Sequence, residues 1–199
     1  MATEVRFSKV DELRESGQEL LLALLNTTPT VSGDRQDDLA DHSSAVVWLA
    51  ANVEDPPGAT DLVQLREVRA GLQSVVSGAE APAVLADVLE QARLAPALSG
   101  NSVSWTIQAP AQALVAARVL LAWDWMRENM PGRLRPCANP ECSRFFVDRS
   151  RNNQARWCSM ATCGNRMKAR RHYARSKRPN VERAARDQYP DSAHDHDHR

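Results

Sequence analysis

Apolar residues recur at helical spacing through most of the first 130 residues. They predict helices over 8–26, 43–52, 60–77, a segment opening at Pro82, and 110–130. Gly17 interrupts the first segment and is expected to divide it into two helices, while residues 28–41 are polar and predict a loop. The pattern therefore indicates a mainly helical N-terminal domain.

One stretch departs from this spacing. Residues 94–98 and 103–107 flank the polar run Ser99-Gly100-Asn101-Ser102, and the second segment alternates apolar and polar positions. Alternation is typical of a half-buried strand, and Pro96 is tolerated only at a sheet edge. We expect a β-hairpin inserted among the helices. The predicted fold class is mainly α with a small β-hairpin (α+β).

All four cysteines lie in one short segment. Cys137 and Cys142 have four residues between them, as do Cys158 and Cys163, and fifteen residues separate the two pairs. Two such pairs supply four soft sulfur donors for a tetrahedral Zn²⁺. Disulfides are the alternative, since four cysteines allow three pairings. Residues 1–9 lack the apolar stretch of an export signal, so we expect a cytoplasmic protein with reduced thiols and one structural Zn²⁺.

The segment around the cysteines resembles the CGNR zinc-finger family. The resemblance rests on Cys137-Ala-Asn-Pro-Glu-Cys142, Phe145-Phe-Val-Asp148, Arg156-Trp-Cys158 and Cys163-Gly164-Asn165-Arg166. It implies a bacterial transcription regulator with an N-terminal ABATE domain, which is associated with stress-induced regulation. The run Leu22–Thr27 is similar to the start of that domain, where an apolar helix ends in Asn-Thr.

Asn26 and Thr27 have two interpretations. In the ABATE pattern an acidic residue often stands three positions before the asparagine, which would suit a ligand site, but here that residue is Ala23. The simpler interpretation makes Asn26 a helix C-cap, and we favour it.

Within the finger we expect a treble-clef-like unit. The segment Cys137–Cys142 would form a knuckle, and Phe145–Val147 would pair with Ala155–Trp157 as a hairpin. The last helix would begin near Ser159, or alternatively at Asn165, and run to about Lys177.

Charge is distributed very unevenly. The chain has 25 Lys/Arg and 25 Asp/Glu, but residues 133–178 hold 13 of the basic and 2 of the acidic ones, leaving 12 and 23 elsewhere. A basic module on an acidic body indicates a polyanionic partner for the module, although a solvated basic face is the alternative. We expect double-stranded DNA.

The candidate nucleic-acid contacts lie in two places. On the last helix, one face carries Arg166, Arg170 and Lys177 with Tyr173, and the other flank carries Lys168, Arg171 and Arg175. The finger tip contributes Arg149, Arg151 and Asn153, side-chain types that read bases, although asparagine is also common in turns. In the Gly164-Asn165-Arg166 motif, Arg166 is also a candidate to brace the thiolates.

Three segments follow from these observations. We expect an ABATE-like helical domain at 1–132, a zinc finger with a basic helix at 133–178, and a disordered tail at 179–199. The predicted function is a DNA-binding transcription regulator whose N-terminal domain senses a small-molecule effector or forms a homodimer. A module for an acidic protein partner, or for RNA, is the alternative. No catalytic motif or bilayer-length apolar run is present, so we expect neither an enzyme nor a membrane protein.

Overall fold

The computed structural model of the protein describes residues 6–7, 10–31, 33–54 and 61–176. The chain divides into two compact units, Met1–Cys158 and Ser159–Arg199. The first unit therefore contains the helical domain together with the first three cysteines. Lys177 and the expected tail at 179–199 lie outside the described residues.

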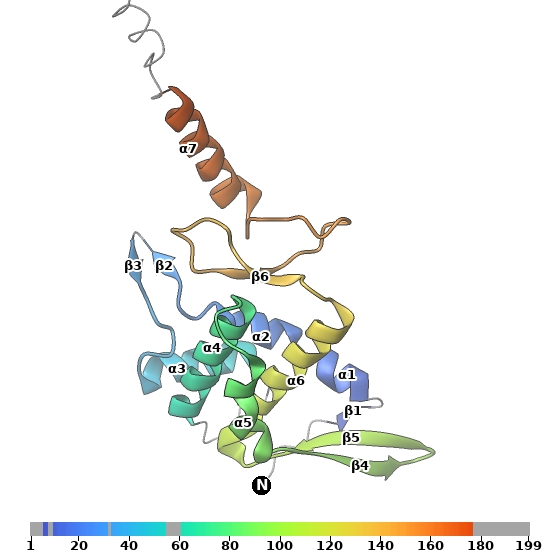
Figure 1. Ribbon diagram of the computed structural model, residues 1–199. Coiled ribbons are helices and arrows are strands. Elements are labelled where there is room, and N and C mark those ends of the chain that lie inside the picture. Colours follow the sequence, from blue (N-terminus) through green and yellow to red (C-terminus); the bar gives the residue numbers. More distant parts are fainter. Residues whose placement is uncertain (1–5, 8–9, 32, 55–60, 177–199) are drawn as a thin grey trace, which may run out of the picture. The chain divides into compact units, whose positions relative to one another are not determined.

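Helices form most of the first unit, as the apolar spacing predicts. They are α1 Val10–Glu15, α2 Gln18–Leu25, α3 His42–Asn52, α4 Leu62–Val76, α5 Ala86–Glu90 and α6 Leu114–Asn129. The longest, α6, packs against α1, α2, α4 and α5 (Figure 1). Leu24, Leu72 and Val119, one from each of three helices, are fully buried. Burial of these apolar faces is the main stabilising contribution to the unit.

Gly17 separates α1 from α2, as the sequence indicates. A Cβ atom at this position would lie 2.8 Å from the Cβ of Ala122 and 3.0 Å from the carbonyl oxygen of Arg118. Because real Cβ atoms do not approach so closely, the glycine lets the α1–α2 junction lie directly against α6.

The predicted hairpin is present as β4 Arg93–Ser99 and β5 Ser102–Gln108. The sequence pattern did not indicate the third strand, β1 Arg6–Phe7, which completes an antiparallel sheet of order β1-β5-β4. Strand β4 is at one edge of this sheet, which explains how it accommodates Pro96. The expected loop at 28–41 also contains a small hairpin of β2 Thr30–Val31 and β3 Asp34–Arg35.

Helix α3 buries one face, since Trp48 and Leu49 are buried while Val47 is 71 % exposed. Two helix expectations need correction. Helix α4 begins after Asp61, whose carboxylate accepts hydrogen bonds from Val63 N and Gln64 N at 2.9 and 3.1 Å, and this is an N-cap. The segment opening at Pro82 is a 3₁₀ turn, η1 Pro82–Leu85, followed by α5, rather than one continuous helix.

The finger's hairpin pairs differently from the prediction. Strand β7 Phe145–Val147 pairs with β6 Leu134–Pro136, in the register Leu134 with Val147 and Pro136 with Phe145. The expected partner, Ala155–Trp157, is not a strand. The second unit begins with a π-helical turn, η3 Met160–Gly164, followed by α7 Asn165–Ser176. The two predicted start points are thus the starts of two consecutive helical segments.

None of the helices in the described ranges combines the length and apolar character needed to cross a bilayer.

Candidate metal centre and basic helix

The four cysteines come together as the sequence predicts. The sulfur atoms of Cys137, Cys142, Cys158 and Cys163 all lie within 4.8 Å of one another. None of the four is in a disulfide. Cys137 and Cys163 are buried, and the other two are half-buried.

The spacing of two of the sulfurs fits a tetrahedral metal site. The Sγ atoms of Cys142 and Cys158 are 3.7 Å apart. Zn–S bonds of about 2.3 Å place the sulfurs of a tetrahedron about 3.8 Å apart, whereas a disulfide would hold them at about 2.05 Å. The cluster can therefore hold one metal ion, and Zn²⁺ suits four thiolates. When bound, the ion cross-links the two cysteine pairs. Four protein ligands leave no open position for a reacting water.

The first cysteine pair is held by a tight turn. Cys137 N donates to Arg144 O at 2.8 Å, and Cys142 N donates to Asn139 O at 2.9 Å. The side chain of Asn139 is buried, and its Oδ1 accepts from Glu141 N at 3.3 Å. Cys158 N also donates to the sulfur of Cys137 at 3.5 Å, a contact that stabilises a thiolate.

The CGNR motif lies at the junction of η3 and α7. Ser159 is the N-cap of η3: its hydroxyl accepts from Thr162 N at 3.3 Å, and its carbonyl accepts from Gly164 N at 3.0 Å. Gly164, which directly follows Cys163, is buried, and the side-chain Nδ2 of Asn165 donates to Ala161 O at 3.3 Å. Gly164 and Asn165 thus form hydrogen bonds within the turn that contains Cys163.

Asp148 explains why 155–157 does not form the expected strand. Its carboxylate is completely buried and accepts from Ser150 N and Ala155 N, each at 2.8 Å. Burial alone would raise the pKa of Asp148, but these hydrogen bonds and the Arg135 guanidinium, 3.6 Å away, hold that pKa below its ordinary value. The Asp148 side chain thus accepts hydrogen bonds from backbone N–H groups that would otherwise be available for pairing in a hairpin.

The finger-tip candidates separate into two kinds. Arg149 and Arg151 are exposed. Asn153 instead has a left-handed backbone, with φ of 52°, and its side-chain oxygen accepts from Arg135. Its amide nitrogen also donates to Pro131 O at 3.4 Å. These contacts match the turn interpretation of Asn153, because asparagine tolerates the left-handed region.

Helix α7 carries the remaining candidates. Its sequence has five basic residues and no acidic one, and none of its residues is buried. The basic side chains Arg166, Lys168, Arg170, Arg171 and Arg175 are exposed, as is Tyr173 at 66 %. Helix α7 itself contains no acidic residue that could neutralise this positive charge.

Asn26 is the C-cap of α2, as favoured from the sequence, and it has a second role. Its Nδ2 donates to Leu22 O at 2.9 Å and to Phe145 O at 3.1 Å. Its Oδ1 accepts from Phe145 N at 2.8 Å. Next to this pair, the Ser143 hydroxyl donates to Thr28 O at 2.8 Å. The end of α2 is thus hydrogen-bonded to the finger strand β7.

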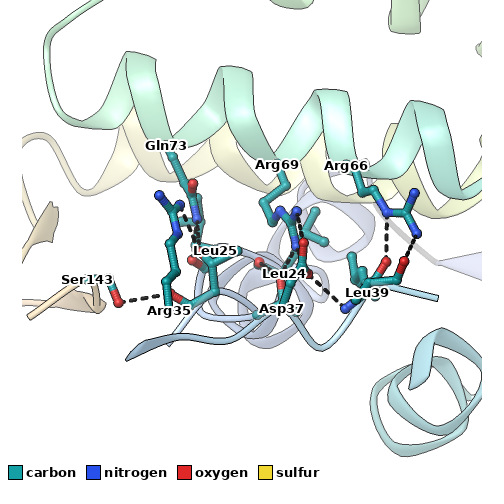
Figure 2. Close-up of polar contacts among 12 residues, drawn as sticks. Leu24, Leu25, Arg35, Asp37, Leu39, Arg66, Arg69, Gln73 and Ser143 are labelled. Atoms are coloured by element: carbon teal, nitrogen blue, oxygen red, sulfur yellow. Dashed lines mark hydrogen bonds and ion pairs between the residues drawn. The ribbon is translucent and has the colours of Figure 1, made fainter. Parts of the chain in front are cut away.

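Thr27 belongs to a buried polar cluster under α4. Its hydroxyl donates to Leu24 O at 2.8 Å and accepts from Arg69 at 2.9 Å. Arg69 also forms a two-pronged ion pair with Asp37, at 2.5 and 2.8 Å, and this guanidinium lowers the pKa of Asp37 despite its partial burial. Figure 2 shows Arg66, Arg69 and Gln73 extending from α4 toward the 27–39 segment.

Sequence reasoning missed this cluster, although a signal was present. Arg69 lies on the face of α4 that buries Leu65 and Leu72, so a charged residue interrupts an otherwise apolar stripe. A buried arginine requires a partner, which an acidic residue in the neighbouring loop supplies. The Asn26–Phe145 pairing had no comparable signal, since both groups on Phe145 belong to the backbone.

Comparison with known families gives two matches. Residues 18–128 match the ABATE family model, described as "Putative stress-induced transcription regulator". Residues 133–176 match the model of the CGNR zinc finger. No curated protein matches the chain.

Proposed function

We propose that this chain is a DNA-binding transcription regulator. It belongs to the ABATE family, because that family's model matches residues 18–128, which is more than half of the chain. The CGNR zinc finger would supply the DNA-binding surface, and the helical domain would sense a signal or form a homodimer. The matched families are described as a regulator and a zinc finger, which agrees with a regulatory rather than an enzymatic protein. We further propose that it acts in the bacterial cytoplasm.

The observation that carries the proposal is the composition and exposure of α7. Five basic side chains on twelve residues, with no acidic residue and none buried, form a surface that attracts a polyanion. Along a helix, Arg166 and Arg170 are one turn apart, and so are Arg171 and Arg175, so two basic rows flank the axis. Basic rows of this kind suit the two phosphate backbones that border a groove.

Arg149 and Arg151 at the finger tip, in the first unit, are further candidates for DNA contact. Both are exposed arginines, whose planar guanidinium groups suit phosphate oxygens and guanine edges alike. Asn153 is a weaker candidate for base reading because its side chain is engaged by Arg135 and Pro131.

The test is duplex binding by the zinc-loaded protein, measured as anisotropy of a labelled random-sequence duplex at low salt. We expect binding that weakens steeply with salt, as counterion release requires. Unlabelled duplex, single-stranded RNA and polyglutamate serve as competitors. Strong competition by polyglutamate but not by duplex would favour an acidic protein partner, and no duplex binding at low salt would reject the proposal. Selection of bound fragments from genomic DNA would then identify the preferred site.

A further inference from the structure

A cavity of about 250 Å³ opens in the first unit, between the ends of α4 and α6 and the first strand of the finger. Its walls are largely apolar, and they include Val75 and Val76 of α4, Met126 of α6, Met130 directly after α6, and Leu134 of β6. The indole of Trp123, also from α6, completes one side. None of the four cysteines lines this cavity, so it is separate from the metal centre.

The size of the cavity limits what it can hold. A dry protein cavity of about 150 Å³ accommodates benzene, whereas pockets for drug-sized ligands begin near 300 Å³. The cavity therefore suits a molecule of one or two fused rings, or an aliphatic molecule of similar bulk. Nucleotides are too large to be enclosed by it.

Two charged residues line the cavity, and they differ in whether another residue already forms an ion pair with them. The Arg127 guanidinium is ion-paired with Asp124 at 2.8 Å and lies 5.9 Å from the centre of the Trp123 ring. Glu80 is exposed, and no residue in the described part of the chain forms an ion pair or hydrogen bond with its carboxylate. The charge left for a ligand is therefore the negative charge of the Glu80 carboxylate, because the Arg127 guanidinium already pairs with Asp124 and lies over the Trp123 ring.

We propose that this cavity is a binding site for a small amphiphilic cation, an amine or ammonium compound with one or two fused rings. Its apolar body packs against Val76, Met126 and Leu134, and its charged group lies beside Glu80. This inference deepens the proposed function, because it names the class of signal that the helical domain senses. It is tested without DNA, so either proposal can fail while the other stands.

The position of Leu134 connects the cavity to the first zinc ligand. Leu134 belongs to β6 and pairs with Val147 of β7. Three residues later Cys137 donates its N–H to Arg144 O, which closes the same hairpin at 2.8 Å. A ligand that packs on Leu134 stabilises β6 and thereby the turn that presents Cys137. Occupancy of the cavity should therefore slow the loss of zinc.

The experiment compares three probes that share one ring system and differ in charge. Binding of 1-naphthylmethylammonium, 1-naphthylmethanol and 1-naphthylacetate to the full-length zinc-loaded protein is measured by calorimetry and saturation-transfer NMR. The ammonium compound should bind about threefold or more tighter than the alcohol, the size expected of a partly exposed ion pair, and the acetate should bind least. Tightest binding by the acetate, or no binding by any probe, would overturn the proposal.

Two matched variants locate the site. Glu80→Gln should remove the preference for the ammonium probe, while Glu90→Gln, which changes an exposed glutamate of α5 outside the cavity lining, should keep it. Val76→Trp should fill the cavity and abolish binding of all three probes. If that variant does not fold, as judged by circular dichroism, the Glu80 and Glu90 pair still decides the question. An equal effect of the two glutamine variants would contradict the assignment of Glu80.

Zinc transfer to a coloured chelator provides a second readout. The ammonium probe should slow transfer from the wild-type protein at a concentration that leaves Glu80→Gln unaffected. Equal transfer rates with and without bound probe would refute the connection between the cavity and the finger.

Discussion

The side chain of Asn26 and the backbone of Phe145, 119 positions apart in the sequence, hydrogen-bond to each other twice. Phe145 N donates to Asn26 Oδ1 at 2.8 Å, and Asn26 Nδ2 donates to Phe145 O at 3.1 Å. The amide of Asn26 thus pairs with β7 as a neighbouring strand would. The end of α2 and the first half of the finger consequently form parts of one compact unit.

Asn26→Asp should weaken this attachment. The carboxylate keeps the acceptor for Phe145 N but replaces the donor with an oxygen that faces the Phe145 carbonyl. An unpaired, part-buried carbonyl costs about 1–3 kcal/mol, so we expect a loss of that order in the free energy of unfolding measured in urea. Zinc should also be released faster.

Asn129→Asp is the matched control. Asn129 lies at the end of α6, and its Nδ2 donates to the carbonyl four residues earlier at 2.9 Å, as that of Asn26 does. It is exposed, however, and within the described residues its side chain forms no hydrogen bond with the finger. Both variants place a negative charge at a helix C-terminus, which is mildly unfavourable. Equal losses of stability in the two variants would show that the Phe145 pairing contributes nothing.

Cys158→Ser should remove the metal. The wild type should contain one Zn²⁺ per chain, and the variant none, by elemental analysis of protein purified without chelators. A short segment such as the finger cannot bury enough surface to fold by itself, so metal binding supplies its folding free energy. The helical signal of the first 130 residues should remain, because their core is built from α2, α4 and α6. A zinc-free wild type would disprove the metal assignment.

Arg170→Ala should weaken duplex binding on every sequence alike. If its guanidinium contacts a phosphate, the slope of log affinity against log salt should flatten by about 0.9. Arg93→Ala, which removes an exposed arginine of β4 in the first unit, is the control and should leave the slope unchanged. An unchanged slope for Arg170→Ala would exclude that residue from the DNA contact.

Asp37→Asn should alter the dependence of stability on acid. The Arg69 guanidinium lowers the pKa of Asp37 in the folded state, so this carboxylate contributes stability above its unfolded pKa of about 3.9. The contribution is lost as pH falls through the lower folded value. Unfolding free energies measured between pH 7 and pH 3 should therefore decline less steeply in the variant. A decline as steep as that of the wild type would contradict a stabilising Asp37–Arg69 pair.

The sequence alone determined the features that local chemistry dictates. Helical spacing located the main helices, alternation located the β4–β5 hairpin, and two cysteine pairs predicted the metal ligands, because each depends on residues close together in the chain. The accumulation of basic residues on α7 was equally visible, since charge is a property of composition.

Only the tertiary structure decided the pairings between distant residues. The finger strand β7 could pair with residues before or after it in the chain. Its partner is β6, which precedes it, because the Asp148 carboxylate accepts hydrogen bonds from Ser150 N and Ala155 N in the segment that follows. The fit of Asn26 to Phe145 depends on backbone atoms, which carry no sequence signature. The cavity beside Leu134 likewise arises from three segments that meet only in the fold, so no local pattern could reveal it.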